Sequence, residues 1–181
     1  MFKRILVAVD GSAASAAGLN AALDLAADQQ ATLTALHVVD DGNPPTHFDD
    51  IAYPRRYADA YIAASEQYGH TLLDRAAASA RKSGVAFEPV VLRTRGHTVA
   101  EVIVAHGRKA KVDVIVLGTH GRRGLKRVLM GSDAEEVVRS SPVPVLLVRD
   151  VYRAARKPRS VTASKKTAGS AARAAAAAPA A

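Results

Sequence analysis

The sequence contains no cysteine and no tryptophan, and aromatic residues make up only 4% of its 181 residues. The absence of cysteine excludes disulfide bonds and thiolate metal sites, which is compatible with a reducing compartment. Its N-terminal apolar run is limited to Ile5–Val9. A secretory signal needs about 7–15 apolar residues and a membrane-spanning helix about 20, so this run is too short for either. We therefore expect a cytoplasmic protein that has no membrane segment.

Most of the formal net charge of +8 belongs to the C-terminal end. Residues 150–181 carry seven basic residues and one acidic residue, which leaves the rest of the chain at +2. This segment is rich in alanine and has few large apolar residues, so little burial would offset the entropy lost on ordering. We predict one folded domain over residues 1–149 and a disordered basic tail over residues 150–181. A weak contact of the tail with polyanions is the alternative.

Five apolar runs with the length of buried strands alternate with helical patterns. The predicted strands are Ile5–Val9, Leu33–Val39, Val85–Leu92, Val112–Leu117 and Val143–Val148. Strands that are apolar on both faces and alternate with helices favour a parallel sheet covered on two sides. With right-handed crossovers, the commonest such architecture is a doubly wound, flavodoxin-like α/β domain.

Capping signals mark the starts of the predicted helices. Ser12 follows the first strand and can cap a helix that runs to about Gln29. A capping box, Thr98 to Glu101, opens another helix. A long helix is predicted from about Tyr57 to Lys82, and a short one, which Ser132 or its neighbour caps, ends at Ser140.

A glycine-rich loop between the fourth strand and the last helix, Gly118 to Ser132, is the candidate anion site. Gly118 and Gly121 would allow close backbone approach and positive φ. Gly131 and Ser132 would offer free N–H groups at a helix start, where the helix dipole favours an anion. The loop also contains four basic residues, for which phosphate contact and simple solvation both remain open: Arg122, Arg123, Lys126 and Arg127.

Catalytic and metal functions find little support in the sequence. The loop lacks the Gly-Lys-Ser/Thr of a Walker A motif and the spacing of a dinucleotide fingerprint. His120 can be a ligand-positioning residue, an exposed loop histidine or a general base, but no candidate nucleophile lies near it. No His-x-x-x-His pair occurs, so we predict no metal site formed by the protein alone. We therefore assign no catalytic residue.

The loop reads Gly-x2-Gly-x9-Gly-Ser and is followed by Pro-Val-Pro-Val-Leu-Leu-Val-Arg. This pattern resembles the ATP-binding signature of the universal stress protein family. The start, Lys-Arg-Ile-Leu-Val-Ala-Val-Asp-Gly-Ser, is similar to that family's first strand and turn, and Leu-His-Val-Val at residues 36–39 to its second strand. The resemblance covers residues 2–149 and implies a five-stranded parallel sheet of order 3-2-1-4-5.

The resemblance implies a cofactor, ATP or another adenine nucleotide with Mg²⁺, and assigns roles to individual residues. Ala8, Val9 and Asp10 would line the ribose and adenine side, and Val38 would offer backbone groups to the adenine edge. Contacts to ribose and phosphates would come from Leu117, Gly118, His120 and Gly121. Gly131 and Ser132 would hold the terminal phosphates.

Asp133 departs from the family pattern, in which many members have a small apolar residue here. Its carboxylate suits the first turn of a helix, and it would either repel a terminal phosphate or help to hold Mg²⁺. The resemblance therefore implies a nucleotide-binding protein of stress response or regulation. One alternative is a member without nucleotide binding that acts as an interaction module, and another is an ATPase, whose hydrolysis would be slow at most.

The family also pairs its fifth strands between subunits. In the implied order, Val143–Val148 is a sheet edge that is apolar throughout. Monomeric proteins avoid long, exposed, hydrophobic edges. We therefore expect a homodimer through this strand.

Overall fold

Five parallel strands form the central sheet of the computed structural model, which describes residues 1–42, 47–48, 51–52, 55–119 and 130–150. Along the chain the strands are β1 (Arg4–Ala8), β2 (Thr32–Val39), β5 (Ala86–Arg93), β6 (Val114–Gly118) and β7 (Val145–Val148). In the sheet they lie in the order β5-β2-β1-β6-β7, and all four pairings are parallel. The predicted doubly wound α/β fold with order 3-2-1-4-5 is confirmed.

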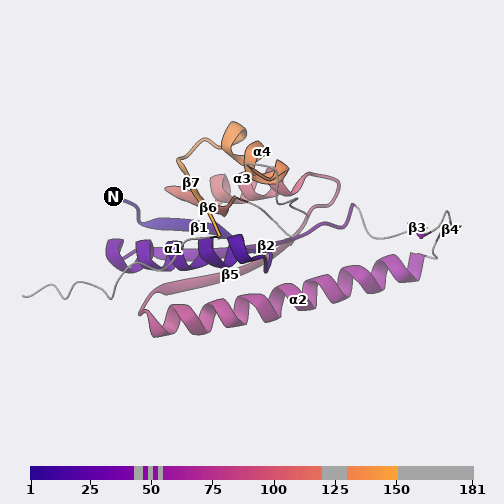
Figure 1. Cartoon of the computed structure of the whole chain (residues 1–181), viewed down its shortest axis with the longest axis horizontal. Coiled ribbons are helices and arrows are strands. Elements are labelled where there is room, and N and C mark those ends of the chain that lie inside the picture. Colours follow the sequence, from indigo (N-terminus) through magenta and orange to yellow (C-terminus); the bar gives the residue numbers. More distant parts are fainter. Residues whose placement is uncertain (43–46, 49–50, 53–54, 120–129, 151–181) are drawn as a thin grey trace, which may run out of the picture.

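Two helices cover each face of the sheet. These are α1 (Ala13–Gln29) and α2 (Arg55–Lys82) on one face, and α3 (Val99–Lys109) and α4 (Ser132–Ser140) on the other (Figure 1). Alternate residues of β1 point to opposite faces, so Ile5 and Val7 pack with α1, whereas Leu6 packs with α3. Both faces of the central strands are therefore buried, which is why their sequences are apolar without alternation.

Local capping bonds fix two helix starts where the sequence predicted them. The Ser15 N–H donates to the Ser12 side-chain oxygen over 3.1 Å at the start of α1. At α3, the Glu101 N–H donates to the Thr98 hydroxyl, and the Thr98 N–H donates to the Glu101 carboxylate. Each bond satisfies a backbone donor that the helix itself leaves without an acceptor.

Two strands begin two residues later than the apolar runs suggest. Val112 was predicted to start the fourth strand, but its N–H donates to the Gly107 carbonyl at the end of α3, and β6 begins at Val114. The fifth strand, predicted from Val143, begins at Val145. Pro144 precedes it and has no N–H for the sheet, although its carbonyl accepts from the Ile115 N–H. Apolar packing thus extends beyond regular strand pairing, at the buried Val112 and at the half-buried Val143.

Helix α2 runs beyond the end of the sheet (Figure 1). None of its side chains from Tyr57 to Tyr68 is buried, whereas Leu73, Ala76 and Ala80 belong to the core. Before it lie two short antiparallel strands that the sequence did not predict, β3 (His47–Phe48) and β4 (Ile51–Ala52). None of the helices in the described part of the chain combines the length and apolar character needed to span a membrane.

Candidate functional site

The order of the strands reverses between β1 and β6. The helix after β1 covers one face of the sheet and the helix after β6 covers the other. In doubly wound folds the carboxyl ends of two such strands form the crevice where ligands bind. Two of the predicted site segments, Asp10 and residues 131–133, follow these strands.

The turn after β1 is fixed by bonds from its own residues. The Ser12 N–H donates to the Asp10 carboxylate over 2.9 Å, and the Asp10 N–H donates to the Ser15 side-chain oxygen over 3.0 Å. Gly11 has a φ of 85°, a conformation that strongly favours glycine. These contacts hold the partly exposed Asp10 just beyond the carboxyl end of β1.

Gly118 packs closely against the start of α1. A Cβ at this position would lie 2.6 Å from the Ala14 carbonyl carbon and 2.7 Å from the Ser15 nitrogen, and both are backbone atoms. Gly18 of α1 faces the same point, since its Cβ would lie 3.3 Å from the Gly118 nitrogen. The prediction that positive φ explains the glycine was wrong, because Gly118 is not among the glycines with positive φ. Close helix–strand packing requires a glycine here.

Residues 119 and 131 bring the two ends of the glycine-rich loop together. The Gly131 N–H donates to the Thr119 carbonyl over 2.8 Å, and the Thr119 N–H donates to the Val148 carbonyl over 2.9 Å. The prediction of a free N–H at Gly131 is therefore wrong. His120 and Gly121, with the four basic residues of the loop, lie outside the described residues.

The start of α4 still provides backbone donors for an anion. Gly131 is the N-cap, and no side chain caps the helix. Ser132 and Ala134 lie in its first turn, where backbone N–H groups have no acceptor within the helix itself. Asp133 and Glu135 place acidic side chains in the first turn. The helix start thus suits an anion, while the two carboxylates oppose a highly charged one unless a cation accompanies it.

The end of β2 extends past its pairing with β1. That pairing ends at Ala8 and Leu36, and the Leu36 carbonyl, on the β1 side, accepts from the Val9 N–H. The Val39 carbonyl points the other way, toward β5, because it accepts from the Thr94 N–H. Since backbone groups alternate in direction along a strand, those of Val38 point toward the crevice.

Ala8, Val9 and Leu117 are placed by packing. Val9 and Leu117 are buried in opposite cores, and the half-buried Ala8 packs against the core of Leu117. The N–H and carbonyl of Val9 are both hydrogen-bonded within the protein. Of the predicted adenine and ribose contacts on β1, Asp10 is therefore the side chain best placed to meet a ligand.

Sequence reasoning missed a polar clasp between the ends of β2 and β5. The Asp41 carboxylate accepts from the Thr94 hydroxyl at 2.6 Å, from the Arg95 N–H at 2.7 Å and from Arg93 Nε at 2.8 Å. The Thr94 bond contributes most to a lowered Asp41 pKa; burial opposes it as the next largest effect, and the Arg95 N–H and Arg93 lower the pKa further. The partners are 52 to 54 residues from Asp41 in sequence, so no local pattern predicts the clasp.

We expect Asp41→Asn to lower the free energy of unfolding at pH 7 by about 2 kcal/mol, because hydrogen bonds to a buried charge are lost. The lowered pKa means that ionised Asp41 stabilises the fold above its ordinary pKa of 3.8. This contribution is lost as the pH falls below that value toward the pKa of the folded state. Urea unfolding of both proteins from pH 7 to pH 3 measures the effect. If the difference in unfolding free energy between wild type and Asp41→Asn does not become smaller in acid, the charge of Asp41 is not its cause.

Sequence reasoning also missed two rings behind the Asp10 turn. His37 is 2% exposed, and its Nδ1–H donates to the Val9 carbonyl over 2.7 Å. Tyr68 of α2 meets His37 edge-on, with ring centroids 6.0 Å apart. The Tyr68 hydroxyl also occupies the place that a Cβ on Gly11 would take.

The described residues include no group of three or more histidine, aspartate and glutamate side chains placed to hold a metal ion. The residues at the switch point between β1 and β6 are joined by a series of contacts. Ser15 contacts both Asp10 and the position of Gly118, and Thr119 joins Gly118 to Gly131. The structure thus brings Asp10, Gly118 and the start of α4 together.

The family model for universal stress proteins matches residues 1–149. The chain belongs to the universal stress protein family. This universal stress protein is 36% identical over 151 residues to the universal stress protein YxiE of Bacillus subtilis, a match that covers 82% of this chain and 100% of the relative.

Solved structures of the family have the same fold as this universal stress protein. The universal stress protein UspA from Lactobacillus plantarum superposes with a TM-score of 0.71 at 26% identity, covering 81% of this chain and 97% of that one. A universal stress protein in complex with cAMP has a TM-score of 0.57, with coverages of 82% and 98%. One from Archaeoglobus fulgidus in complex with dAMP has a TM-score of 0.52, with coverages of 81% and 97%. Both complexes are 23% identical to this chain and show its fold.

Proposed function

We propose that this universal stress protein binds an adenine nucleotide, with ATP and Mg²⁺ as the expected ligand, in the crevice between β1 and β6. The observation that carries the proposal is the contact series from Asp10 through Ser15 and Gly118 to the start of α4. It places a carboxylate, a typical acceptor for ribose hydroxyls, near helix N–H groups that suit phosphates. The cAMP and dAMP complexes support the ligand class, since proteins of this fold hold adenine nucleotides.

The backbone of Val38 supports the choice of adenine as the base. Its N–H and C=O extend beyond the pairing of β1 with β2 on the crevice side. One donor and one acceptor of the same residue match the N1 and N6 edge of adenine. Guanine presents a carbonyl and an N–H at that edge, so it reverses the pattern. We therefore expect adenine nucleotides to bind more tightly than guanine nucleotides.

Ligand identification and titration test this function together. Protein freshly purified under native conditions is denatured, and the released small molecules are identified by mass spectrometry. Calorimetric titrations with AMP, ADP, ATP and GTP then give affinities, with and without Mg²⁺. If no adenine nucleotide binds at millimolar concentration, the nucleotide function is excluded, and the interaction-module alternative takes its place.

We propose that the protein acts in the cytoplasm, where it regulates through nucleotide binding rather than through rapid nucleotide hydrolysis. A hydrolase needs a general base within hydrogen-bond reach of the attacking water and a group that orients the base. His37 does not serve, because it is buried and its Nδ1 is bonded to the Val9 carbonyl. Phosphate release slower than about one per minute is expected, against typical enzyme turnover of roughly 1–1,000 per second.

We further propose a homodimer through β7, which is an edge of the sheet. Leu146 on this strand is 40% exposed, and Val138 on the neighbouring helix α4 is 44% exposed. Leu146→Lys should therefore give a folded monomer, because a charge on a short edge strand opposes pairing. Sedimentation of both proteins at micromolar concentration measures this, with Asp24→Lys on the exposed side of α1 as the control. A monomeric wild type would exclude the dimer.

A further inference from the structure

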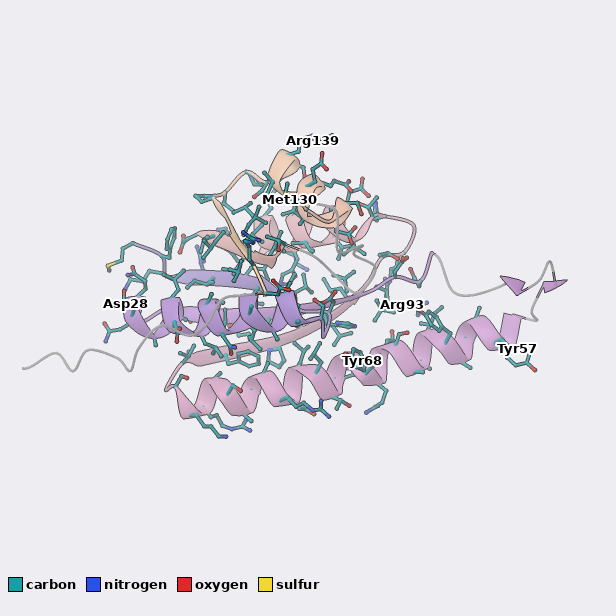
Figure 2. All side chains as sticks on the ribbon, in the orientation of Figure 1. Asp28, Tyr57, Tyr68, Arg93, Met130 and Arg139 are labelled. Carbon is teal, nitrogen blue, oxygen red and sulfur yellow. The ribbon has the colours of Figure 1, made fainter. Side chains whose placement is uncertain are left out.

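Tyr68 joins α2 to the turn that carries Asp10. Its ring meets the edge of the buried His37, and its hydroxyl lies against Gly11. Tyr68 is 41% exposed, and it lies where α2 begins to run past the sheet, whereas Tyr57 lies near the far end of the helix (Figure 2). This tyrosine is thus the point at which the exposed part of α2 reaches the candidate site.

His37 holds the same turn at Val9. Its bond to the Val9 carbonyl holds the residue before Asp10. Gly69, next to Tyr68 in α2, leaves the room that the His37 ring needs, since a Cβ there would lie 3.1 Å from Cγ and 3.3 Å from Nε2 of that ring. The backbone from Val9 to Gly11 is therefore held by two rings that contact each other, one from β2 and one from α2.

A second contact fixes α2 near this point. Glu66, two residues before Tyr68, has its carboxylate 3.9 Å from Arg93 Nε, which also bonds Asp41 at 2.8 Å. The clasp at the ends of β2 and β5 thus positions the stretch of α2 that presents Tyr68. One segment of α2 therefore contacts both the Asp10 turn and the clasp.

We propose that Tyr68 is a positioning residue for the nucleoside half of the site, acting through the backbone of residues 9–11 on the Asp10 carboxylate. The proposal rests on the nucleotide function and adds how the site is held. A carboxylate binds a ribose well only when its supporting residues lock it in the productive geometry. The phosphate half, at the start of α4, lies on the other face of the sheet from α2 and Tyr68. The two halves are therefore separable by mutation.

We expect Tyr68→Ala to weaken AMP binding about tenfold, the factor equivalent to 1.4 kcal/mol, measured by calorimetry on the full-length protein. Tyr68→Phe keeps the ring against His37 and should lose less. Tyr57→Ala, the same substitution on the same helix but far from the turn, should bind AMP as the wild type does. Because removal of Tyr68 opens space behind Gly11, backbone amide resonances of Gly11 and Ser12 should shift in Tyr68→Ala, while those of Ser132 and Asp133 stay in place.

These readouts separate the failure of this proposal from failure of the nucleotide function. If the wild type does not bind AMP, the nucleotide function fails, and the amide resonances still decide whether Tyr68 fixes the turn. If the wild type binds AMP and Tyr68→Ala binds it within about twofold, Tyr68 is not a positioning residue. Equal shifts at Gly11 and Ser132 would mean that Tyr68 supports the whole domain, which also contradicts the proposal.

Discussion

Gly118→Ala is expected to lower the free energy of unfolding by about 3 kcal/mol, the upper part of the range for overpacked sites. The added methyl group would meet the Ala14 carbonyl carbon at 2.6 Å and its oxygen at 2.7 Å. These atoms belong to the helix backbone, so they cannot move aside as a flexible side chain does. Helix α1 would have to separate from β6, and its packing in the core would be disturbed.

Gly42→Ala is the matched control for this substitution. A Cβ on Gly42 would lie 3.7 Å from the Asp40 Oδ1, an ordinary van der Waals distance, and Gly42 is not among the residues with positive φ. Replacing glycine at such a site is neutral or slightly stabilising, by about 0.4–1 kcal/mol. Urea unfolding without nucleotide measures both variants. If Gly118→Ala proves as stable as Gly42→Ala, the glycine is not required for packing against α1.

The doubly wound class was predictable because burial on both faces leaves an apolar run in each central strand, whereas the order 3-2-1-4-5 was implied by the family resemblance. A run such as Leu33–Val39 reads as apolar without reference to its neighbours, and the short connections then restrict the topology. The caps at Ser12 and Thr98 were predictable for a similar reason, since each bond joins residues three apart. Information that is local in sequence was thus enough for the elements and the fold class, and the resemblance supplied the strand order.

Features that depend on distant contacts were missed. The Gly131 N–H was predicted to be free because helix starts leave such groups without a partner, but Thr119 on the other side of the loop accepts it. The partners of Asp41 and the position of Tyr68 against Gly11 follow only once strands and helices are assembled. Sequence reasoning therefore located the candidate site at the ends of β1 and β6, whereas the structure shows which distant contacts fix the backbone around it.

Gly131→Val is expected to lower the affinity for ATP by at least about a hundredfold, equivalent to about 2.7 kcal/mol. Gly131 has a φ of −74° and a ψ of 151°, an extended conformation that valine adopts readily. Its N–H can still donate to the Thr119 carbonyl, so the loop closure survives. The isopropyl group would nevertheless stand beside the first N–H groups of α4, where we propose that the phosphates bind.

The thermal shift that ATP produces provides the measurement. A ligand at one hundred times its dissociation constant stabilises by about 2.7 kcal/mol, which corresponds to a rise of about 5–10 °C in Tm for a domain of this size. Wild type should show this rise with Mg²⁺ and ATP, and Gly131→Val should not. The variant itself should lose about 1 kcal/mol, because valine is a poorer N-cap than glycine.

Thr98→Val distinguishes two reasons for losing the ATP-induced rise in Tm, a blocked phosphate site and a loosened helix α4. This substitution removes the N-cap of α3 and also the Thr98 hydroxyl bond to the Glu136 carboxylate of α4. It therefore costs stability and frees one contact of α4, but it places nothing near Gly131. We expect Thr98→Val to keep the ATP-induced rise in Tm. If both variants lose that rise, the rigidity of α4 is the cause. If Gly131→Val keeps it, the phosphates do not lie at the start of α4, because no bound phosphate fits beside that side chain.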